Sequence, residues 1–378
     1  MNPLIRELVG CAKDPAAVAR FAEEHPVPLV ARDHVTFVFV GDADAVNLRH
    51  WIFGLPGSYE LTRVPHTKVW TCDFELPARS RVEYKIEVVR EGHGEWILDP
   101  LNPRRAHDPF GANSVCYGPG YERPAWTEHD PEARTGSLDL IAVDSAAFGD
   151  RREIPVYLPA RFRPTRRYPL LVVHDGYDYL EYSGLKTVLD NLIDALEIPA
   201  MVVALTNPRD RLVEYAADPR HARHLVEEVV PALEARYPLL GRPGSRGLLG
   251  ASFGAVASLS TAWRYPGFFG RLALQSGSFA FTDIGTRHTR SREFDPVVAF
   301  VNAFRAAPGR PSERVYMSCG IHESLIYENR SMLPVLQATG MELRYAEARD
   351  GHNWENWRDR LREGLSYLWP GPLWMTYE

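Results

Sequence analysis

The feature that most constrains the fold of this chain is the segment GASFG, in which Ser252 stands two residues from a glycine on either side. The residues before it, SRGLLG, form a short apolar run that is typical of a buried parallel strand. After it, AVASLSTAWRYP carries apolar residues at helical spacing and stops at Pro266. A strand, a tight turn and a helix in this order are the setting in which a G-x-S-x-G serine is an exposed nucleophile. We therefore predict that Ser252 is a nucleophile rather than one serine in a loop of small residues.

The chain after about residue 150 alternates strands with helices. The runs YPLLVVHDG and AMVVALTNP are continuously apolar, as expected of buried strands, whereas GLKTVLDNLIDALEI and PRHARHLVEEVVPALEARYP each have the period of a helix. Strands and helices of this length predict right-handed crossovers and a mostly parallel sheet covered on both faces. The predicted fold class is α/β, with the architecture of an α/β-hydrolase.

A different pattern precedes this part, and at 378 residues the chain is long enough for two domains. Residues 1–30 have helical periodicity. Residues 31–125 consist of short β-branched and aromatic runs separated by Gly, Pro and Asp, a pattern typical of an all-β sandwich. A Pro- and Gly-rich stretch near Tyr121 marks the end of this domain, so residues 126–378 are expected to form the catalytic domain.

A serine nucleophile needs an imidazole to take its proton and a carboxylate to orient that imidazole. In α/β-hydrolases the chain order is Ser, acid, His, and His352 lies between the expected last strand and last helix. Glu323 follows the strand RVYMSCG and is the expected acid, although it also suits the first turn of a helix. Asp350 is too close to His352 in the sequence to reach round it. A Ser-His dyad without a strong acid partner remains the alternative.

The oxyanion that forms on attack needs two backbone N–H donors. One is expected from Phe253, the residue after the nucleophile, and the other from the loop after an earlier strand. The strand LLVVHDG ends there, so Gly176 or Tyr177 is the expected second donor, and Asp175 is interpreted as a residue that fixes the turn.

Composition limits the partners. The formal net charge of −6 gives no general attraction to nucleic acid or to an anionic membrane. The N-terminus lacks the pattern of a secretory signal and no stretch is long enough to cross a bilayer, so we expect a cytoplasmic protein. The four cysteines form no C-x-x-C pair, so they predict no zinc site. His221 and His224 share a helix face without a third ligand, and we interpret them as solvated helix histidines rather than metal ligands. We expect no metal and no cofactor, and the sequence gives no signal for the oligomeric state.

With these residues located, the chain resembles the enterochelin (ferric-siderophore) esterases and related esterases of the esterase D type. The similarity runs through HDGYDYLEYSGLKTVLDNLI, TNPRDRLVEYAADPRHARHLVEEVVPALEARYP, GASFGAVASL, LQSGSF and DGHNWENWRDRL, in the order and spacing of that family. The resemblance gives Ser252 and His352 the roles of nucleophile and base and places Gly176 in the oxyanion loop. It also places Arg211 and Glu214 near the substrate pocket, with a structural ion pair between them as the alternative.

The segments VTFVFVGDADAVNLRHW and WILDPLNP resemble the early-set immunoglobulin-like domain that precedes siderophore esterases. Related modules bind sugar through exposed tryptophans; here Trp51, Trp70 and Trp96 fit either that role or the core of the sandwich. Two departures concern the substrate. His174 stands where the family commonly has an aliphatic residue, and an anionic siderophore calls for a basic pocket, which Arg287 and its neighbours Arg290 and Arg292 would supply.

The resulting prediction is a serine carboxylic-ester hydrolase that works through an acyl-enzyme on a small-molecule or oligomeric ester. The resemblance suggests a siderophore trilactone as substrate. One alternative keeps the chemistry but takes a feruloyl, acetyl or polyester ester held by the N-terminal domain. Another is a carbohydrate-binding or scaffolding protein without activity, against which the intact Ser252, His352 and Gly176 argue.

Overall fold

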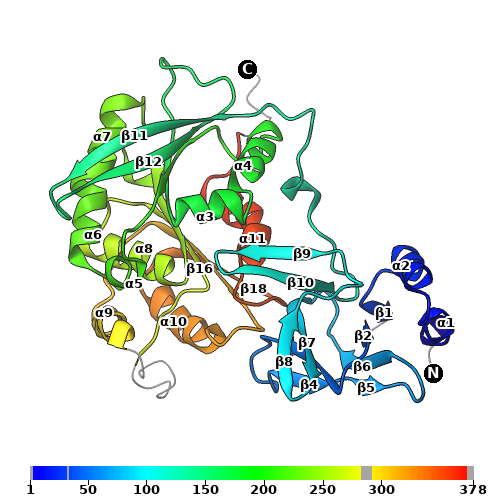
Figure 1. Ribbon diagram of the computed structural model, residues 1–378. Coiled ribbons are helices and arrows are strands. Elements are labelled where there is room, and N and C mark those ends of the chain that lie inside the picture. Colours follow the sequence, from blue (N-terminus) through cyan, green and yellow to red (C-terminus); the bar gives the residue numbers. More distant parts are fainter. Residues whose placement is uncertain (1–2, 32–33, 282–291, 373–378) are drawn as a thin grey trace. The chain divides into compact units, whose positions relative to one another are not determined.

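The computed structural model describes residues 3–31, 34–281 and 292–372 (Figure 1). The chain forms two compact units. The first unit consists of Met1–Arg123 together with two short segments from late in the sequence, Ile321–Ser324 and Ala348–Asn353. The second unit holds the remaining residues. Each late segment contains one residue predicted to be catalytic, Glu323 in the first and His352 in the second.

The first unit begins with two helices and continues as antiparallel strands. Helix α2 starts at a proline and is capped by the Asp14 side chain, which accepts a hydrogen bond from the N–H of Ala16 at 3.0 Å. The helices are α1 (Pro3–Cys11) and α2 (Pro15–Glu24). One sheet has the strand order β1 (Leu29–Ala31), β2 (His34–Val40), β6 (Val69–Glu75), β5 (Thr62–Arg63). The other has the order β4 (Ser58–Glu60), β3 (Ala45–His50), β7 (Arg81–Arg90), β10 (Gly111–Tyr117), β9 (Arg105–Asp108), with β8 (His93–Ile97) paired to β7.

Alternation of buried and exposed residues along the strands builds one core between these two sheets. In β3 every second residue is buried, and Phe37 from β2 meets Tyr84 from β7 edge to face with ring centroids 4.8 Å apart. Of the three tryptophans, only Trp70 is buried, whereas Trp51 and Trp96 are half exposed. Trp70 is therefore a core aromatic, and sugar stacking stays a prediction for the other two.

The second unit is built on an eight-stranded sheet, and its five central strands run parallel. The strand order is β11 (Ser137–Ser145), β12 (Asp150–Leu158), β14 (Val202–Thr206), β13 (Leu170–His174), β15 (Arg246–Ala251), β16 (Arg271–Gln275), β17 (Arg314–Gly320), β18 (Glu342–Ala348). β11 pairs antiparallel with β12, and β12 pairs antiparallel with β14. The carboxyl ends of the parallel strands therefore share one edge of the sheet, where α/β proteins bind their ligands.

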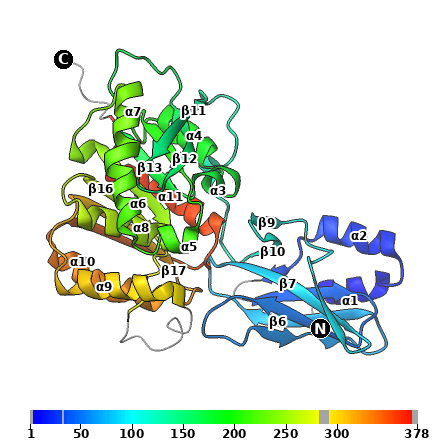
Figure 2. The same ribbon diagram turned by 60° about the vertical axis from the view of Figure 1, so that its left-hand side comes forward.

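Helices cover both faces of this sheet (Figures 1 and 2). Successive residues of each central strand alternate between two apolar clusters: Leu171 and Val173 pack with one set of helices, and Leu170 and Val172 with the other. The first set is α3 (Gly176–Glu181), α4 (Leu185–Asp194) and α11 (Trp354–Leu368). The second set is α6 (Pro219–Arg223), η2 (His224–Val229), α7 (Val230–Arg236), α8 (Phe253–Arg264), α9 (Asp295–Ala306) and α10 (Ile326–Ala338). The predicted α/β-hydrolase architecture is confirmed.

Short helices complete the described chain: η1 (Ala125–Thr127), α5 (Arg211–Glu214), η3 (Pro243–Ser245) and η4 (Arg292–Phe294). The single long helix expected over residues 219–238 is instead divided, because a π-helical turn separates α6 from α7 just before Pro231. Proline has no N–H to donate, and wider turns of this kind often occur at functional positions in helices. No helix among the described residues is long and apolar enough to cross a membrane.

Candidate active site

Ser252 lies on the sharp turn between β15 and α8. Its backbone has φ 57° and ψ −121°, a conformation that non-glycine residues rarely adopt and that costs on the order of 1–3 kcal/mol. The turn is held because the N–H of Ser252 donates to the carbonyl of Gln275 at 2.9 Å, at the end of the neighbouring strand β16. The chain thus maintains strain at the residue that the motif identifies as the nucleophile.

The two glycines of the motif are required by close packing. A Cβ on Gly250 would lie 2.9 Å from the Cα of Gly254 and would overlap its carbonyl group. A Cβ on Gly254 would lie 3.2 Å from the Cβ of His174 on strand β13. These contacts explain the spacing of the motif, because the strand and the helix can cross this closely only without side chains at those two positions.

A second serine contacts Ser252, the predicted nucleophile. The hydroxyls of Ser252 and Ser278 are 3.0 Å apart, and the N–H of Ser278 donates to the carbonyl of Ser252 at 3.3 Å. Ser278 is buried and follows β16, the strand next to β15. The sequence did not predict Ser278, although its position just after the strand next to that of Ser252 was a usable signal.

Glu323 and His352 form a hydrogen-bonded pair in the first unit. The Nδ1 atom of His352 lies 2.5 Å from Oε2 of Glu323, whose side chain is buried, while the imidazole is exposed. Glu323 follows β17 and His352 follows β18, its neighbour in the sheet. Because a carboxylate only accepts hydrogen bonds, Nδ1 carries the proton and the lone pair of the neutral ring is on Nε2. The pair has the geometry of a general base with its orienting acid.

One other carboxylate, Asp350, was rejected as the acid on sequence grounds. Asp350 is buried, and its carboxylate is 3.2 Å from the Arg81 guanidinium. It also accepts a hydrogen bond from the N–H of Gly351 at 2.7 Å. Asp350 is therefore engaged by Arg81 and Gly351, whereas the carboxylate that contacts His352 Nδ1 is that of Glu323.

The two expected sources of the second oxyanion donor differ in availability. The N–H of Tyr177 donates to the side-chain carbonyl of Asn207 at 2.9 Å. Gly176 and Phe253 are the first residues of α3 and α8, where N–H groups have no acceptor inside the helix. Among the described residues, no hydrogen bond uses either of these two N–H groups. The geometry favours Gly176 over Tyr177.

Gly176 itself is fixed by packing. A Cβ at this position would lie 2.5 Å from the Cα of Leu205 on the neighbouring strand β14. The preceding residue, Asp175, has φ 54° and makes no side-chain capping hydrogen bond, so it does not fix the turn in the expected way. Its carboxylate instead binds Arg211, with Nε and Nη2 at 3.0 Å and 2.9 Å.

Arg211 and Glu214 do not form the ion pair that the sequence left open. Besides Asp175, Arg211 contacts the carbonyl of Ala251, the residue before the nucleophile, at 3.3 Å. Glu214 is buried and binds Arg152 through both carboxylate oxygens, at 2.6 Å and 3.1 Å. Arg211 thus adjoins the turn of Ser252, whereas Glu214 contacts Arg152 and the backbone N–H of Arg209.

Three histidines of the second unit are buried, contrary to expectation. His174, His221 and His224 each have at most 3% of their surface exposed, so the prediction of solvated helix histidines is wrong for the last two. His174 Nδ1 lies 3.1 Å from the carbonyl of Leu249, and its Nε2 lies 2.9 Å from Nε2 of His221. A carbonyl only accepts, so the Nδ1 of His174 donates and His221 donates to the Nε2 of His174. His174 therefore bonds into the core rather than lining the mouth of the oxyanion loop.

These histidines predict acid sensitivity. Burial lowers the pKa of His174 from 6.5 to about 4 and the pKa of His221 well below its ordinary value. Below pH 6.5 the unfolded chain binds protons that the folded chain excludes, so stability is complete above that pH and is lost as the pH falls towards 4. The shift at His174 alone contributes on the order of 3 kcal/mol to this loss, and His221 acts in the same direction. Denaturant unfolding at several pH values should show this fall in the free energy of unfolding.

The matched comparison uses His174→Gln, which should flatten the pH dependence, and the exposed His93→Gln, which should preserve it. A wild-type protein that is equally stable at both ends of the window would contradict this account of the buried histidines.

One further prediction concerns charged groups. Arg287, expected to bind substrate, lies outside the described residues, as does Arg290, whereas Arg292 is described and exposed.

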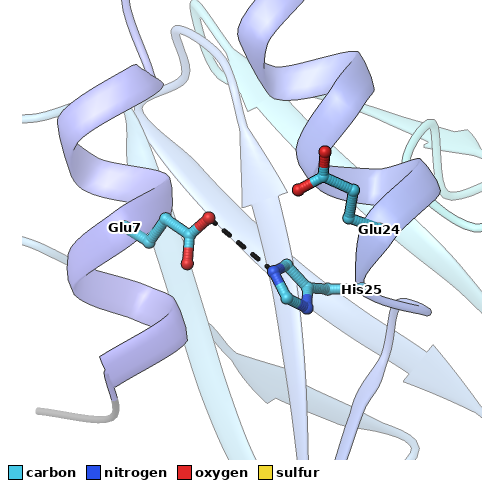
Figure 3. Close-up of side chains that lie close together, drawn as sticks. All are labelled: Glu7, Glu24 and His25. Carbon is cyan, nitrogen blue, oxygen red and sulfur yellow. Dashed lines mark ion pairs between the residues drawn. The ribbon is translucent and has the colours of Figure 1, made fainter.

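Among the described residues, the one group of three His, Cys, Asp or Glu side chains whose ligand atoms lie within 4.8 Å of one another is Glu7, Glu24 and His25 (Figure 3). Glu7 and His25 form an ion pair at 3.7 Å. The carboxylates are solvent-exposed, an arrangement that is common without a metal, and it carries no cofactor assignment.

Comparison with known proteins gives a consistent picture. The family model of the Esterase family, described as "Putative esterase", matches residues 145–368. The chain is 23% identical over 352 residues to the Iron(III) enterobactin esterase of Dickeya dadantii (strain 3937), covering 82% of this chain and 79% of that protein. It is 28% identical over 150 residues to the Uncharacterized protein YjcH of Bacillus subtilis (strain 168), covering 38% of this chain and 62% of that protein, less than two thirds of its length.

A solved structure shares the fold. The crystal structure of the enterobactin esterase FES from Shigella flexneri in the presence of enterobactin superposes with a TM-score of 0.72 at 21% identity. The match covers 89% of this chain and 92% of that one. The common fold thus extends over both the β-rich first part and the α/β part of the sequence.

Proposed function

Since the chain belongs to the Esterase family, it is a carboxylic ester hydrolase, and we propose that it cleaves esters through an acyl-enzyme on Ser252. The observation that carries the proposal is the strained backbone of Ser252 between β15 and α8, with glycines where the strand and helix cross. A serine held in this way presents its hydroxyl at the carboxyl edge of the sheet. Backbone strain of this kind is concentrated at functional sites, which favours a catalytic role.

The proposed base is His352, oriented by Glu323. The order along the chain is Ser252, Glu323, His352, as in α/β-hydrolases. The strands that precede the three residues are β15, β17 and β18, and β15, β16 and β17 are parallel, which supports a common edge for their loops. The 2.5 Å contact between His352 Nδ1 and Glu323 supports the assignment of Nε2 as the atom that takes the proton.

The proposed reaction has two halves. Nε2 of His352 removes the proton from Ser252 Oγ, which attacks the ester carbonyl carbon, and the N–H groups of Phe253 and Gly176 bind the resulting oxyanion. Collapse of this intermediate breaks the carbon–oxygen bond of the ester, and the imidazolium protonates the departing alcohol. Water then gives a proton to His352 and attacks the acyl group, and collapse of the second intermediate returns the proton to Ser252 and frees the carboxylic acid.

For the substrate, we propose a siderophore trilactone. Support comes from the relative named as an iron(III) enterobactin esterase and from the extent of the shared fold. An anionic iron chelate needs local positive charge, because the formal net charge of the chain is −6. We propose that Arg211 at the nucleophile turn and Arg287 supply it, while Glu214 holds Arg152 in place.

A substrate panel tests this proposal. We expect ferric and iron-free trilactone to be hydrolysed with a higher kcat/KM than a feruloyl ester or a polyester oligomer, and added salt to raise KM for the ferric form. Ser252→Ala serves as the blank for each substrate. Rapid cleavage of the feruloyl ester or the polyester, with neither trilactone hydrolysed, would overturn the substrate proposal and leave the serine mechanism in place.

A further inference from the structure

The first unit contains a fully buried arginine whose partners bracket the proposed catalytic histidine. Arg81, the first residue of β7, has no exposed surface. Its Nη1 atom lies 3.2 Å from Oδ1 of Asp350 and 3.0 Å from Oδ1 of Asn353, and its Nη2 lies 2.9 Å from Glu83. Asp350 and Asn353 stand on either side of His352 in the sequence. One guanidinium thus holds both ends of the segment that carries the proposed base.

The backbone strengthens this connection. The N–H of Arg81 donates to the carbonyl of Arg349 at 2.9 Å, and within the loop Asp350 accepts a hydrogen bond from the Asn353 side chain at 2.8 Å. The loop that precedes Glu323 is tied to the same point, because the N–H of His322 donates to the carbonyl of Asp350 at 3.1 Å. The loops of the base and of the acid therefore share one anchor, and that anchor is bound to Arg81.

Burial of these charged groups costs free energy unless each of them is paired and hydrogen-bonded. A buried charge is stable only when it is paired and hydrogen-bonded, and removal of one partner leaves the other uncompensated. Burial raises the pKa of Asp350 to about 6, although Arg81 acts in the opposite direction. Without Arg81 that pKa would rise further, and Asp350 would tend to be protonated at neutral pH. The state of the loop around His352 is thus coupled to a residue of the N-terminal β-rich part of the chain.

We propose that Arg81 is a positioning residue for the catalytic imidazole: through Asp350 and Asn353 it fixes the segment that holds His352 against Glu323. The inference rests on the proposed function, since it takes His352 as the base. It gives the N-terminal part of the chain a role in catalysis that requires no contact between that part and the substrate. Misplacement of a catalytic group by about 1 Å can lower the rate about 100-fold, so a loss of this size is available to such a residue.

The test separates positioning from folding with three variants. Arg81→Met removes the charge at similar volume and should lower kcat on the order of tenfold to 100-fold, with KM changed by less than about twofold. Arg81→Lys should recover part of kcat. Because Arg81→Met leaves Asp350 unpaired, the double variant Arg81→Met with Asp350→Asn should regain stability to thermal unfolding while its kcat stays low.

The matched control is Arg49→Met. Arg49 pairs with Glu87 at 2.6 Å in the same unit and stacks on Trp96, so its side-chain contacts are with these two residues and not with the loops of Glu323 and His352. It should lower stability without lowering kcat. The downfield proton resonance of His352 Nδ1, expected from its 2.5 Å contact with Glu323, should shift or broaden in the Arg81 variants and remain in the Arg49 variant.

The outcomes separate a failure of the role of Arg81 from a failure of the proposed function. A double variant that regains wild-type kcat along with its stability would show that Arg81 is merely structural and would overturn the inference. So would an Arg81→Met protein that folds and retains full kcat and an unchanged Nδ1 resonance. Loss of activity in His352→Ala, measured alongside, would show that the proposed base still stands in either case.

Discussion

Replacing Ser252 with alanine is expected to lower kcat by about 10⁴-fold or more on every ester the protein cleaves. Without the hydroxyl no acyl-enzyme can form, and only the oxyanion donors and the bound geometry remain to assist direct attack by water. Initial rates on p-nitrophenyl butyrate measure the loss, and circular dichroism checks the fold. The variant should be folded, because Ser252 contributes few contacts beyond its hydroxyl pair with Ser278.

Ser260→Ala is the control for this substitution. Ser260 is buried in the same helix α8, where its hydroxyl donates to the carbonyl of Ala257, and the variant should keep the wild-type rate. A folded Ser252→Ala protein with more than a trace of the wild-type rate would mean that another group is the nucleophile.

The second large effect is expected at Glu323. Glu323→Gln should lower kcat by about 10² to 10⁴-fold, less than the loss of Ser252. The amide is neutral and cannot stabilise the imidazolium as the carboxylate does, and it can present an N–H to Nδ1 and favour the wrong tautomer. The oxyanion donors and the imidazole survive the change. Steady-state kinetics across a range of pH measure both the drop and any change in the pH profile.

Glu347→Gln is the matched control for Glu323. Glu347 lies on β18 and pairs with Arg330 at 2.7 Å, so its replacement should leave kcat unchanged. If Glu323→Gln also retained full activity, the site would work as a Ser-His dyad or with a different carboxylate.

The parts of this account that the sequence predicted are those with local signals. The nucleophile turn needs only a strand, two glycines and a helix within about fifteen residues, and each leaves a mark on hydrophobic periodicity or on residue size. The parallel sheet follows from the alternation of apolar runs with amphipathic helices. The pairing of Glu323 with His352 was predicted from the order Ser, acid, His along the chain. That order works because the loops after neighbouring strands come together in the fold, although the two residues are far apart in the sequence.

The parts that the sequence did not predict depend on tertiary partners. Asn207 occupies the N–H of Tyr177 from 30 residues away, which a reading of the loop alone cannot detect. His221 looked like a residue on a solvated helix face, but the helix packs against the sheet and places it beside His174. Arg81 is 269 residues from Asp350, and a buried arginine at the start of a strand has no sequence signature.

The most direct test of the central claim is covalent trapping of the nucleophile. Purified protein is treated with a fluorophosphonate, the intact mass is measured, and the modified peptide is sequenced by mass spectrometry. The account predicts one adduct per chain, located on Ser252 and absent from Ser252→Ala. An excess of an intact ester that the enzyme cleaves should suppress the adduct. An adduct on any other residue, or full esterase activity in a protein that the reagent leaves unmodified, would contradict it.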